Sequence, residues 1–276
     1  MSRVETIEVA TSSSSKRLKV NDTHNNNNNS SNNSSSSSSM SPQEQTIGGS
    51  SMEVEDGGVV KVWNYIDNKL VEPSTGEYMD VVCPSTNGVI GKVGISASAD
   101  VDVAVASAKK AFESWSQLTI KARATILLKF HALVRDNAME LAECIVQENG
   151  KNITEALADV AKGNETVEYA CSMPLVAAGR TLQVSSNVEC MDVRKPLGVV
   201  ASIVPFNFPL MVPMWTLPIA LVMGNTMILK PSEKVPLTMY KVTSLLQQAG
   251  VPPGVVNLLQ GTKDVVNSII DHPDVT

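Results

Sequence analysis

The sequence has no charged side chain between Lys195 and Lys230, although 18% of the whole chain is charged. Roughly 20 apolar residues are enough to cross a bilayer, so length alone would permit a membrane span. Prolines make that span unfavourable, because each destabilises a helix interior by on the order of 3 kcal/mol. Each also leaves a backbone carbonyl without a donor, and lipid cannot supply one. The segment contains Pro196, Pro205, Pro209, Pro213 and Pro218. We therefore expect a buried core and no membrane association.

Metal-binding spacing and a basic surface are also absent. The four cysteines show no Cys-x-x-Cys pair and the three histidines are scattered, so no metal site is predicted. Unpaired thiols are typical of a reducing compartment. The net charge of −6 argues against nucleic acid as a partner. The cysteines are Cys83, Cys144, Cys171 and Cys190.

The N-terminal segment has little that could fold. Residues 11–40 contain 12 Ser and 8 Asn, and such a composition cannot offset the entropy cost of ordering. We predict a disordered low-complexity tail over 1–58 and a folded part over 59–276. No apolar core of a signal peptide is present, so we expect no secretion. Glu5, Glu8 and Asp22 are also atypical of a mitochondrial transit peptide and favour a cytoplasmic protein.

The first part of the folded region reads as two strand pairs followed by helices. The pattern predicts strand pairs at 61–69 and 80–93, with turns at Asp67-Asn68 and Asn87-Gly88. Asp100 is in position to cap a helix that runs to Trp115. Long amphipathic helices are expected over 121–147 and 153–171, and an extended, polar arm over 182–193.

The second part alternates strands and helices, which indicates an α/β fold with a parallel sheet. The apolar run divides into a β-branched strand, a helix tolerant of proline in its first turn, and a second strand. One more helix, strand and helix follow. The expected elements are 198–204, 209–222, 226–229, 236–249, 255–261 and 263–271.

Two of these strands deliver polar residues to the edge where doubly wound sheets bind ligands. No Gly-x-Gly-x-x-Gly phosphate loop is present. Glu233 could accept hydrogen bonds from an adenosine ribose, with Lys230 donating to the same sugar, and its charge would favour NAD over NADP. Nearby Lys230 and Lys234 weaken that preference. Alternatively, Glu233 only begins the next helix, where a carboxylate complements the helix dipole.

Asn207 is the second candidate, set between two aromatic residues and two prolines in an apolar turn. A buried amide needs hydrogen-bond partners, so either the backbone satisfies it or it points at a ligand. An amide donor in a dry site can stabilise an oxyanion. The other interpretation is a residue that only forms the turn.

Three segments together resemble the NAD-dependent aldehyde dehydrogenase superfamily: Pro205-Phe206-Asn207-Phe208-Pro209, Asn225-Thr226 and Lys230-Pro231-Ser232-Glu233. The resemblance runs from about residue 62 to 276. It is closest to the CoA-acylating methylmalonate-semialdehyde dehydrogenase branch. This assignment depends on Phe206, where most members have Trp, and on the segments Met211-Val212-Pro213-Met214-Trp215 and Asp271-His272-Pro273-Asp274.

The resemblance implies a Rossmann-like sheet of the aldehyde dehydrogenase fold, truncated after about three strands. It implies Asn207 as the oxyanion amide. It also implies NAD contacts from Val204, Phe206, Lys230, Glu233 and Lys234, although Lys234 replaces the Arg common in this branch. The implied reaction oxidises malonate or methylmalonate semialdehyde to acetyl- or propionyl-CoA, in valine and pyrimidine catabolism. A mitochondrial location and a homo-oligomer are likewise implied.

The resemblance also implies that the nucleophilic cysteine lies beyond residue 276. None of the four cysteines is placed to replace it, so we expect the chain to be inactive alone and, with an open sheet edge, a weak NAD binder. Two alternatives are open. The chain could be a non-catalytic interaction protein that joins full-length subunits through the arm at 182–193. In the second and least favoured alternative, the uncharged run between Lys195 and Lys230 is a membrane anchor.

Overall fold

The computed structural model describes residues 59–276 and three short strand pieces before them, all within one compact unit, Glu44–Thr276. The pieces are β1 (Thr46–Ile47), β2 (Ser50–Ser51) and β3 (Val54–Glu55). The first strand of the continuously described region, β4, begins at Val59. The disorder expected for 1–58 otherwise concerns residues outside those described, and stays a prediction.

A five-stranded sheet forms the centre, in the order β11-β12-β13-β5-β6. Its first three strands are parallel, as the sequence predicts, whereas β5 runs antiparallel to β13 and pairs with β6. Asp67 and Asn68 join β5 to β6 with positive φ angles of 55° and 57°. The strands are β5 (Asn64–Ile66), β6 (Lys69–Val71), β11 (Val199–Ile203), β12 (Thr226–Lys230) and β13 (Val256–Leu258).

Both faces of the parallel strands are apolar, which explains the long uncharged run. Side chains alternate across a strand, so Met227 and Leu229 join one core cluster while Ile228 joins the cluster on the opposite face. All five residues of β12 are buried. The run folds as β11, α6 (Met211–Val222) and β12, so the predicted β-α-β is confirmed. Its helix begins two residues later than predicted.

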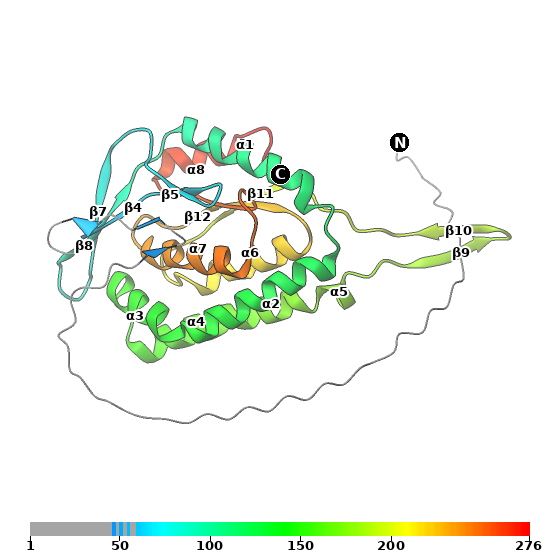
Figure 1. Cartoon of the computed structure of the whole chain (residues 1–276), viewed down its shortest axis with the longest axis horizontal. Helices are drawn as coiled ribbons and strands as arrows, with labels where there is room; N and C mark the ends of the chain where they lie inside the picture. The colour runs from blue at the N-terminus through cyan, green and yellow to red at the C-terminus, as the bar shows by residue number, and fades with distance from the viewer. Residues whose placement is uncertain (1–45, 48–49, 52–53, 56–58) are drawn as a thin grey trace, which may run out of the picture. The chain divides into compact units, whose positions relative to one another are not determined.

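Helices cover the sheet in layers (Figure 1). Helices α1 and α8 lie on one face, α6 and α7 lie on the other, and α2, α3 and α4 form a further layer outside these. The helices are α1 (Ser98–Trp115), α2 (Ile120–Asp136), α3 (Ala138–Asn149), α4 (Ile153–Cys171), α5 (Met173–Val176), α7 (Leu237–Ala249) and α8 (Lys263–Ile270). Within the described part, no helix is both long and apolar enough to cross a membrane.

Two details of the helix prediction are wrong. Asp100 is not the N-cap of α1 but its third residue, where its carboxylate accepts from the backbone N–H of Ala97 at 2.8 Å. The single helix expected over 121–147 is two helices, because α2 ends at Asp136 and α3 begins at Ala138. Asn137 separates them, its side chain donating to the carbonyl of Leu133 at 2.8 Å. A polar side chain that bonds nearby backbone favours such an interruption.

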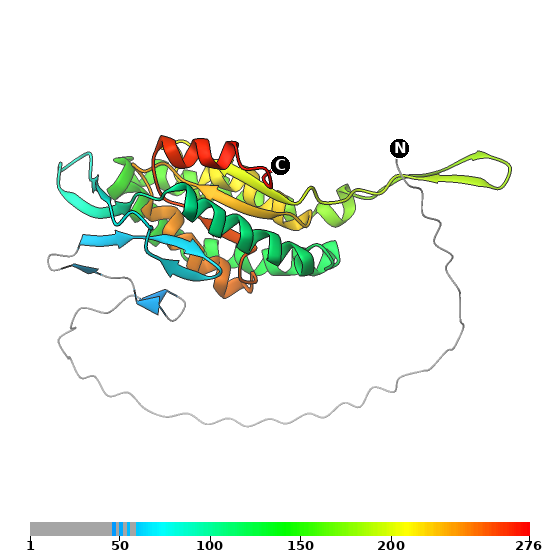
Figure 2. The same ribbon diagram turned by 90° about the horizontal axis from the view of Figure 1, so that it is seen from above.

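Within the described residues three further sheets lie outside the central one, the smallest being the antiparallel pair of β1 and β2. A four-stranded sheet has the order β3-β4-β8-β7 and contains the predicted strand pair at 80–93. The predicted arm is a hairpin of β9 and β10 that projects away from the helices, clearest in Figure 2, and every residue of both strands is exposed. The strands are β4 (Val59–Val62), β7 (Tyr78–Val82), β8 (Val89–Gly94), β9 (Thr181–Ser185) and β10 (Val188–Met191).

After α8 the chain returns to the edge of β11 that faces away from β12. There Val275 pairs in parallel with Val199, and the N–H of Thr276 donates to the Val199 carbonyl at 3.0 Å. The chain thus adds β12 and β13 on one side of β11 and then continues on its other side, so the strand order reverses direction beside β11. In open α/β sheets, ligands bind outside the carboxyl ends of the strands at such a switch point.

Candidate functional site

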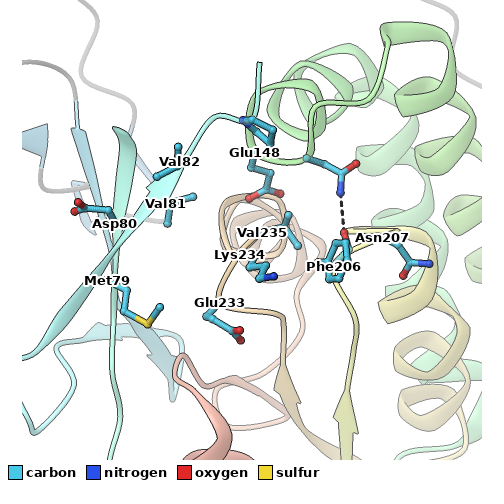
Figure 3. A pocket seen from close by; sticks show the side chains of 12 residues that line it. Met79, Asp80, Val81, Val82, Glu148, Phe206, Asn207, Glu233, Lys234 and Val235 are labelled. Atoms are coloured by element: carbon cyan, nitrogen blue, oxygen red, sulfur yellow. Dashed lines mark hydrogen bonds between the residues drawn. The ribbon is translucent and has the colours of Figure 1, made fainter. Parts of the chain in front are cut away.

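Two cavities flank the carboxyl ends of β11 and β12. The larger, of 480 Å³, lies between Phe206-Asn207, the Glu233–Val235 loop and the strand β7. The smaller, of 350 Å³, lies between the end of β11, Lys230, Glu233 and the start of α8. Phe206 and Glu233 line both, so these two residues divide the sheet edge into neighbouring compartments. Figure 3 shows the larger cavity with Phe206 and Glu233 among the side chains lining it.

Lys230 and Glu233 form an ion pair at the floor of the smaller cavity. The Lys230 ammonium lies 3.1 Å from the Glu233 carboxylate, and the two side chains are 4% and 29% exposed. Burial by itself would raise the pKa of Glu233. A backbone hydrogen bond and the charges of Lys230 and Lys234 outweigh it and hold this pKa below its ordinary value. Glu233 is thus an ionised acceptor with one side open to the cavity.

Glu233 does not begin the following helix. That helix, α7, starts at Leu237, and its free N–H groups are bound by Glu148 of α3 instead. The alternative interpretation of Glu233 as a helix-dipole residue is therefore wrong.

The other predicted cofactor contacts lie around this pair. The N–H of Val204 donates to the carbonyl of Lys230 at 3.1 Å, which joins the ends of β11 and β12. The ring of Phe206 is 51% exposed, and the ammonium of Lys234 lies 5.2 Å from its centre, within cation–π range. The structure thus brings Val204, Phe206, Lys230, Glu233 and Lys234 together at one edge of the sheet.

Asn207 lines the larger cavity, where Figure 3 shows it beside Phe206. The predicted burial of Asn207 is wrong, because Asn207 is exposed. The physical reason is that its turn follows the last residue of β11 and precedes α6, so it stands at the rim of the sheet. Within the described residues its side chain forms no hydrogen bond, which leaves the amide free to meet a ligand.

The neighbours of Asn207 are held by residues at the end of α3, in the α3–α4 connection and on α4. The side-chain amide of Asn149 donates to the Phe206 carbonyl at 2.8 Å (Figure 3, dashed line). The ammonium of Lys151 lies 3.9 Å from the centre of the Phe208 ring. Asp159 accepts from the N–H of Met211 at 2.7 Å and from Lys151 at 2.7 Å.

The site roles of Glu148, Asn149, Lys151 and Asp159 were not predicted, although Glu148 and Asp159 carried a signal in the sequence. Glu148 and Asp159 stand on the apolar faces of amphipathic helices, at i+3 or i+4 from buried residues such as Cys144, Ile145 and Ala156. A carboxylate at such a position must have a partner. Asn149 offered no such signal, because Asn before Gly is expected at a helix end.

The Glu148 side chain is buried, so its carboxylate needs hydrogen-bond donors. Its carboxylate accepts from the N–H of Leu237 at 2.7 Å, the N–H of Thr238 at 3.0 Å and the Thr238 hydroxyl. Burial raises its pKa to about 7, against the opposing effect of these hydrogen bonds. The residue therefore holds the start of α7, directly after the Glu233 loop, against the end of α3.

None of the four cysteines lines the larger cavity together with Asn207, although Cys83 stands between Val82 and Pro84, which do. Burial raises the pKa of Cys144 to about 12, so this thiol is inert. Hydrogen bonds from Ser85 and Thr86 lower the pKa of Cys83 to about 7. These hydrogen bonds come from the hydroxyl groups and the backbone of the two residues and not from a basic partner.

The donors and acceptors at the smaller cavity fit a nucleoside. A carboxylate held ionised by a buried ammonium can accept both hydroxyl protons of a ribose, as acidic residues do in dinucleotide-binding sheets. Apolar Val204 and Val266 and the exposed Phe206 ring supply surfaces for a flat base. The fold and this site define a nucleotide-binding α/β domain of the doubly wound class.

The aldehyde dehydrogenase family model matches residues 70–276, and the chain belongs to this family. Malonate-semialdehyde dehydrogenase of Bacillus velezensis is 47% identical over 216 residues, which cover 78% of this chain and 44% of that protein. The Bacillus subtilis protein of the same name is 45% identical with the same coverage. This chain therefore spans less than half the length of these curated relatives.

Solved structures agree. A Sinorhizobium meliloti protein complexed with NAD has a TM-score of 0.78 at 35% identity, covering 80% of this chain and 45% of that one. Methylmalonate-semialdehyde dehydrogenase from Oceanimonas doudoroffii has a TM-score of 0.76 at 34% identity, covering 78% and 44%. The expected family, its branch and its fold are confirmed.

Proposed function

We propose that this chain is the cofactor-binding portion of an enzyme that oxidises malonate or methylmalonate semialdehyde with NAD and releases the acyl group to CoA. The single observation that carries the proposal is the Lys230–Glu233 pair at the cavity beside β11. Relatives whose names specify these semialdehydes, and a solved neighbour that holds NAD, support it.

The residues of this chain would divide the work between the two cavities. Glu233 would accept from the adenosine ribose, Lys230 would keep Glu233 ionised and donate to the same sugar, and Val204, Phe206 and Lys234 would complete that side. Bound NAD would supply the hydride acceptor. Across Phe206, the amide of Asn207 would donate to the oxygen of the aldehyde as negative charge develops there.

None of the four cysteines lines the larger cavity with Asn207, so we propose that none of them is the nucleophile. We therefore expect residues 1–276 to produce no NADH from NAD, CoA and either semialdehyde, in a spectrophotometric assay at 340 nm run beside an intact relative. Turnover by the chain that Asn207→Ala abolishes would show that a nucleophile has been overlooked. Continued reading of the transcript past Thr276 into a cysteine-bearing segment would support the intact-enzyme proposal.

A second function is favoured by one observation, the exposed apolar side chains on the β9–β10 arm. Leu182, Val184 and Met191 are 64%, 51% and 71% exposed. Apolar side chains on a projecting two-stranded ribbon are typical of a contact with another subunit. The arm would then join this chain to further copies or to full-length subunits, with or without catalysis.

A further inference from the structure

Asn207 stands between two anchored neighbours, while its own amide is free. Phe206 is held through its carbonyl and Phe208 through its ring, both by residues of the α3–α4 segment. We propose that Asn149, Lys151 and Asp159 are positioning residues that fix the Asn207 turn, so that its amide is oriented before any ligand arrives. This inference rests on the oxyanion role proposed above for Asn207.

The first contact fixes the peptide group directly before Asn207. The Phe206 carbonyl belongs to the peptide bond that ends at the Asn207 nitrogen, and Asn149 donates to it at 2.8 Å. Asn149 is itself immobilised at the end of α3. Gly150 closes that helix in a left-handed conformation with φ of 81°, its N–H donating to Val146 at 3.1 Å.

The second contact acts on the residue after Asn207. The Lys151 ammonium lies over the Phe208 ring, 3.9 Å from the centre of the ring. The same ammonium donates to the Asp159 carboxylate at 2.7 Å. Only 14% of the Lys151 side chain is exposed, and the Asp159 side chain is fully buried. An ammonium fixed between a carboxylate and a ring leaves little freedom to either partner.

The third contact fixes where the turn ends. Asp159 accepts from the N–H of Met211, the first residue of α6, so a residue of α4 caps the helix that follows the turn. The cap is supplied from a distant segment because Leu210, at the N-cap position, has no side-chain acceptor.

These contacts do more than pack α4 against α6. Packing alone would need only apolar surface, such as Leu210 and Met214 against Gly163, where a Cβ would lie 2.4 Å from Leu210. The three polar contacts instead converge on residues 206, 208 and 211 and omit 207. Holding a donor in its reactive orientation beforehand avoids reorganisation during the reaction.

The test measures backbone motion at Asn207 by ¹⁵N relaxation in the full chain 1–276, with selective Asn labelling and assignment through Asn207→Ser. We expect an order parameter of about 0.85, as for rigid backbone. In Asn149→Asp, which keeps the shape but loses the N–H donor, we expect a fall below about 0.6 at Asn207, while Asn164 within α4 stays unchanged. Asn152→Asp is the matched control, since Asp also caps α4 through the bond to Glu155.

Either of two results would overturn the inference: an order parameter below about 0.6 in the unaltered chain, or no change in Asn149→Asp. The order parameter of Asn207 in the unaltered chain can overturn the inference even if the Asn149→Asp variant does not fold. Relaxation is read without cofactor, so a chain that binds no NAD would contradict the proposed function and leave this result intact. Conversely, a mobile Asn207 in a chain that binds NAD would reject the positioning role alone.

Discussion

The ammonium of Lys230 lies 3.1 Å from the carboxylate of Glu233, and it is the more deeply buried partner of the two. The charge of Lys230 is therefore committed to Glu233, whose open side faces the smaller cavity. The sequence left open whether Lys230 would cancel the acidic character of the site. In the structure Lys230 instead lowers the pKa of Glu233 and keeps its carboxylate ionised as an acceptor.

Because Glu233 is ionised and would face the adenosine ribose in the proposed site, NADP should bind more weakly than NAD. We expect a preference of about tenfold or more, the size of one charge-assisted hydrogen bond lost together with repulsion of the 2′-phosphate. Glu233→Gln should reduce the preference, measured as the ratio of the two dissociation constants. Lys234→Gln removes the ammonium that lies 5.2 Å from the centre of the Phe206 ring, and should widen the preference. Equal affinities for both cofactors would contradict the ribose assignment.

The burial of Glu148 should make stability depend on pH. Its pKa of about 7 in the folded state lies above the ordinary value of 4.5, so folding favours the protonated form. This contribution is fully present below pH 4.5 and is lost as the pH rises through about 7. At about 1.36 kcal/mol per pKa unit, its size is on the order of 3 kcal/mol.

Glu148→Gln should remove this contribution, and Glu143→Gln, an exposed position on the same helix, should retain it. The free energy of unfolding by urea is measured for the unaltered chain and for both variants. The pH runs from about 4 to about 8 in steps of roughly one unit. A parallel pH dependence in the unaltered chain and Glu148→Gln would show that Glu148 does not titrate in this range.

Asp159→Ala should destabilise the chain strongly. It leaves the ammonium of Lys151 without its carboxylate partner in a largely buried position, which costs about 3–5 kcal/mol. Lys162→Ala, which breaks an exposed ion pair with Glu165 on the same helix, should change stability by no more than about 0.5 kcal/mol. Comparable losses in the two variants, in urea unfolding, would mean that Asp159 is not a buried anchor.

The arm supplies a test of association. Replacing Leu182, Val184 and Met191 together by Ser should shift the chain toward monomer in light scattering coupled to size-exclusion chromatography, because it removes the apolar surface of the hairpin. Val103→Ser, at a 57% exposed position on α1, is the control and should leave the mass unchanged. A monomer at every concentration before substitution would count against the arm as a contact between copies of this chain.

Local patterns predicted most of the architecture, because they record burial and turn chemistry directly. The alternation around Ile228, the turn at Asp67-Asn68 and the exposed arm all follow from them. The pairing of β5 with β13 did not, since it joins Tyr65 to Leu258 across the chain. The strand ends that carry Glu233 and Asn207 were predicted for the same local reasons.

What surrounds those two residues could not be predicted. The bond from Asn149 to Phe206 and the cap from Glu148 to Leu237 join residues far apart in sequence, so the pairings leave no local pattern, even where Glu148 stands on the apolar face of its helix. The exposure of Asn207 depends on where the turn stands relative to α3 and β7, which is a property of the assembled fold.

The central claim is that the cavity at the ends of β11 and β12 takes the nucleoside part of NAD. The most direct measurement follows backbone amide shifts of the full chain by NMR during addition of NAD up to on the order of 10 mM. The account predicts saturable shifts confined to Val204–Asn207, Lys230–Lys234 and the start of α8, with affinity at least about tenfold weaker in Glu233→Gln. Shifts elsewhere in the chain, no shifts at all, or equal affinity in Glu233→Gln would contradict it.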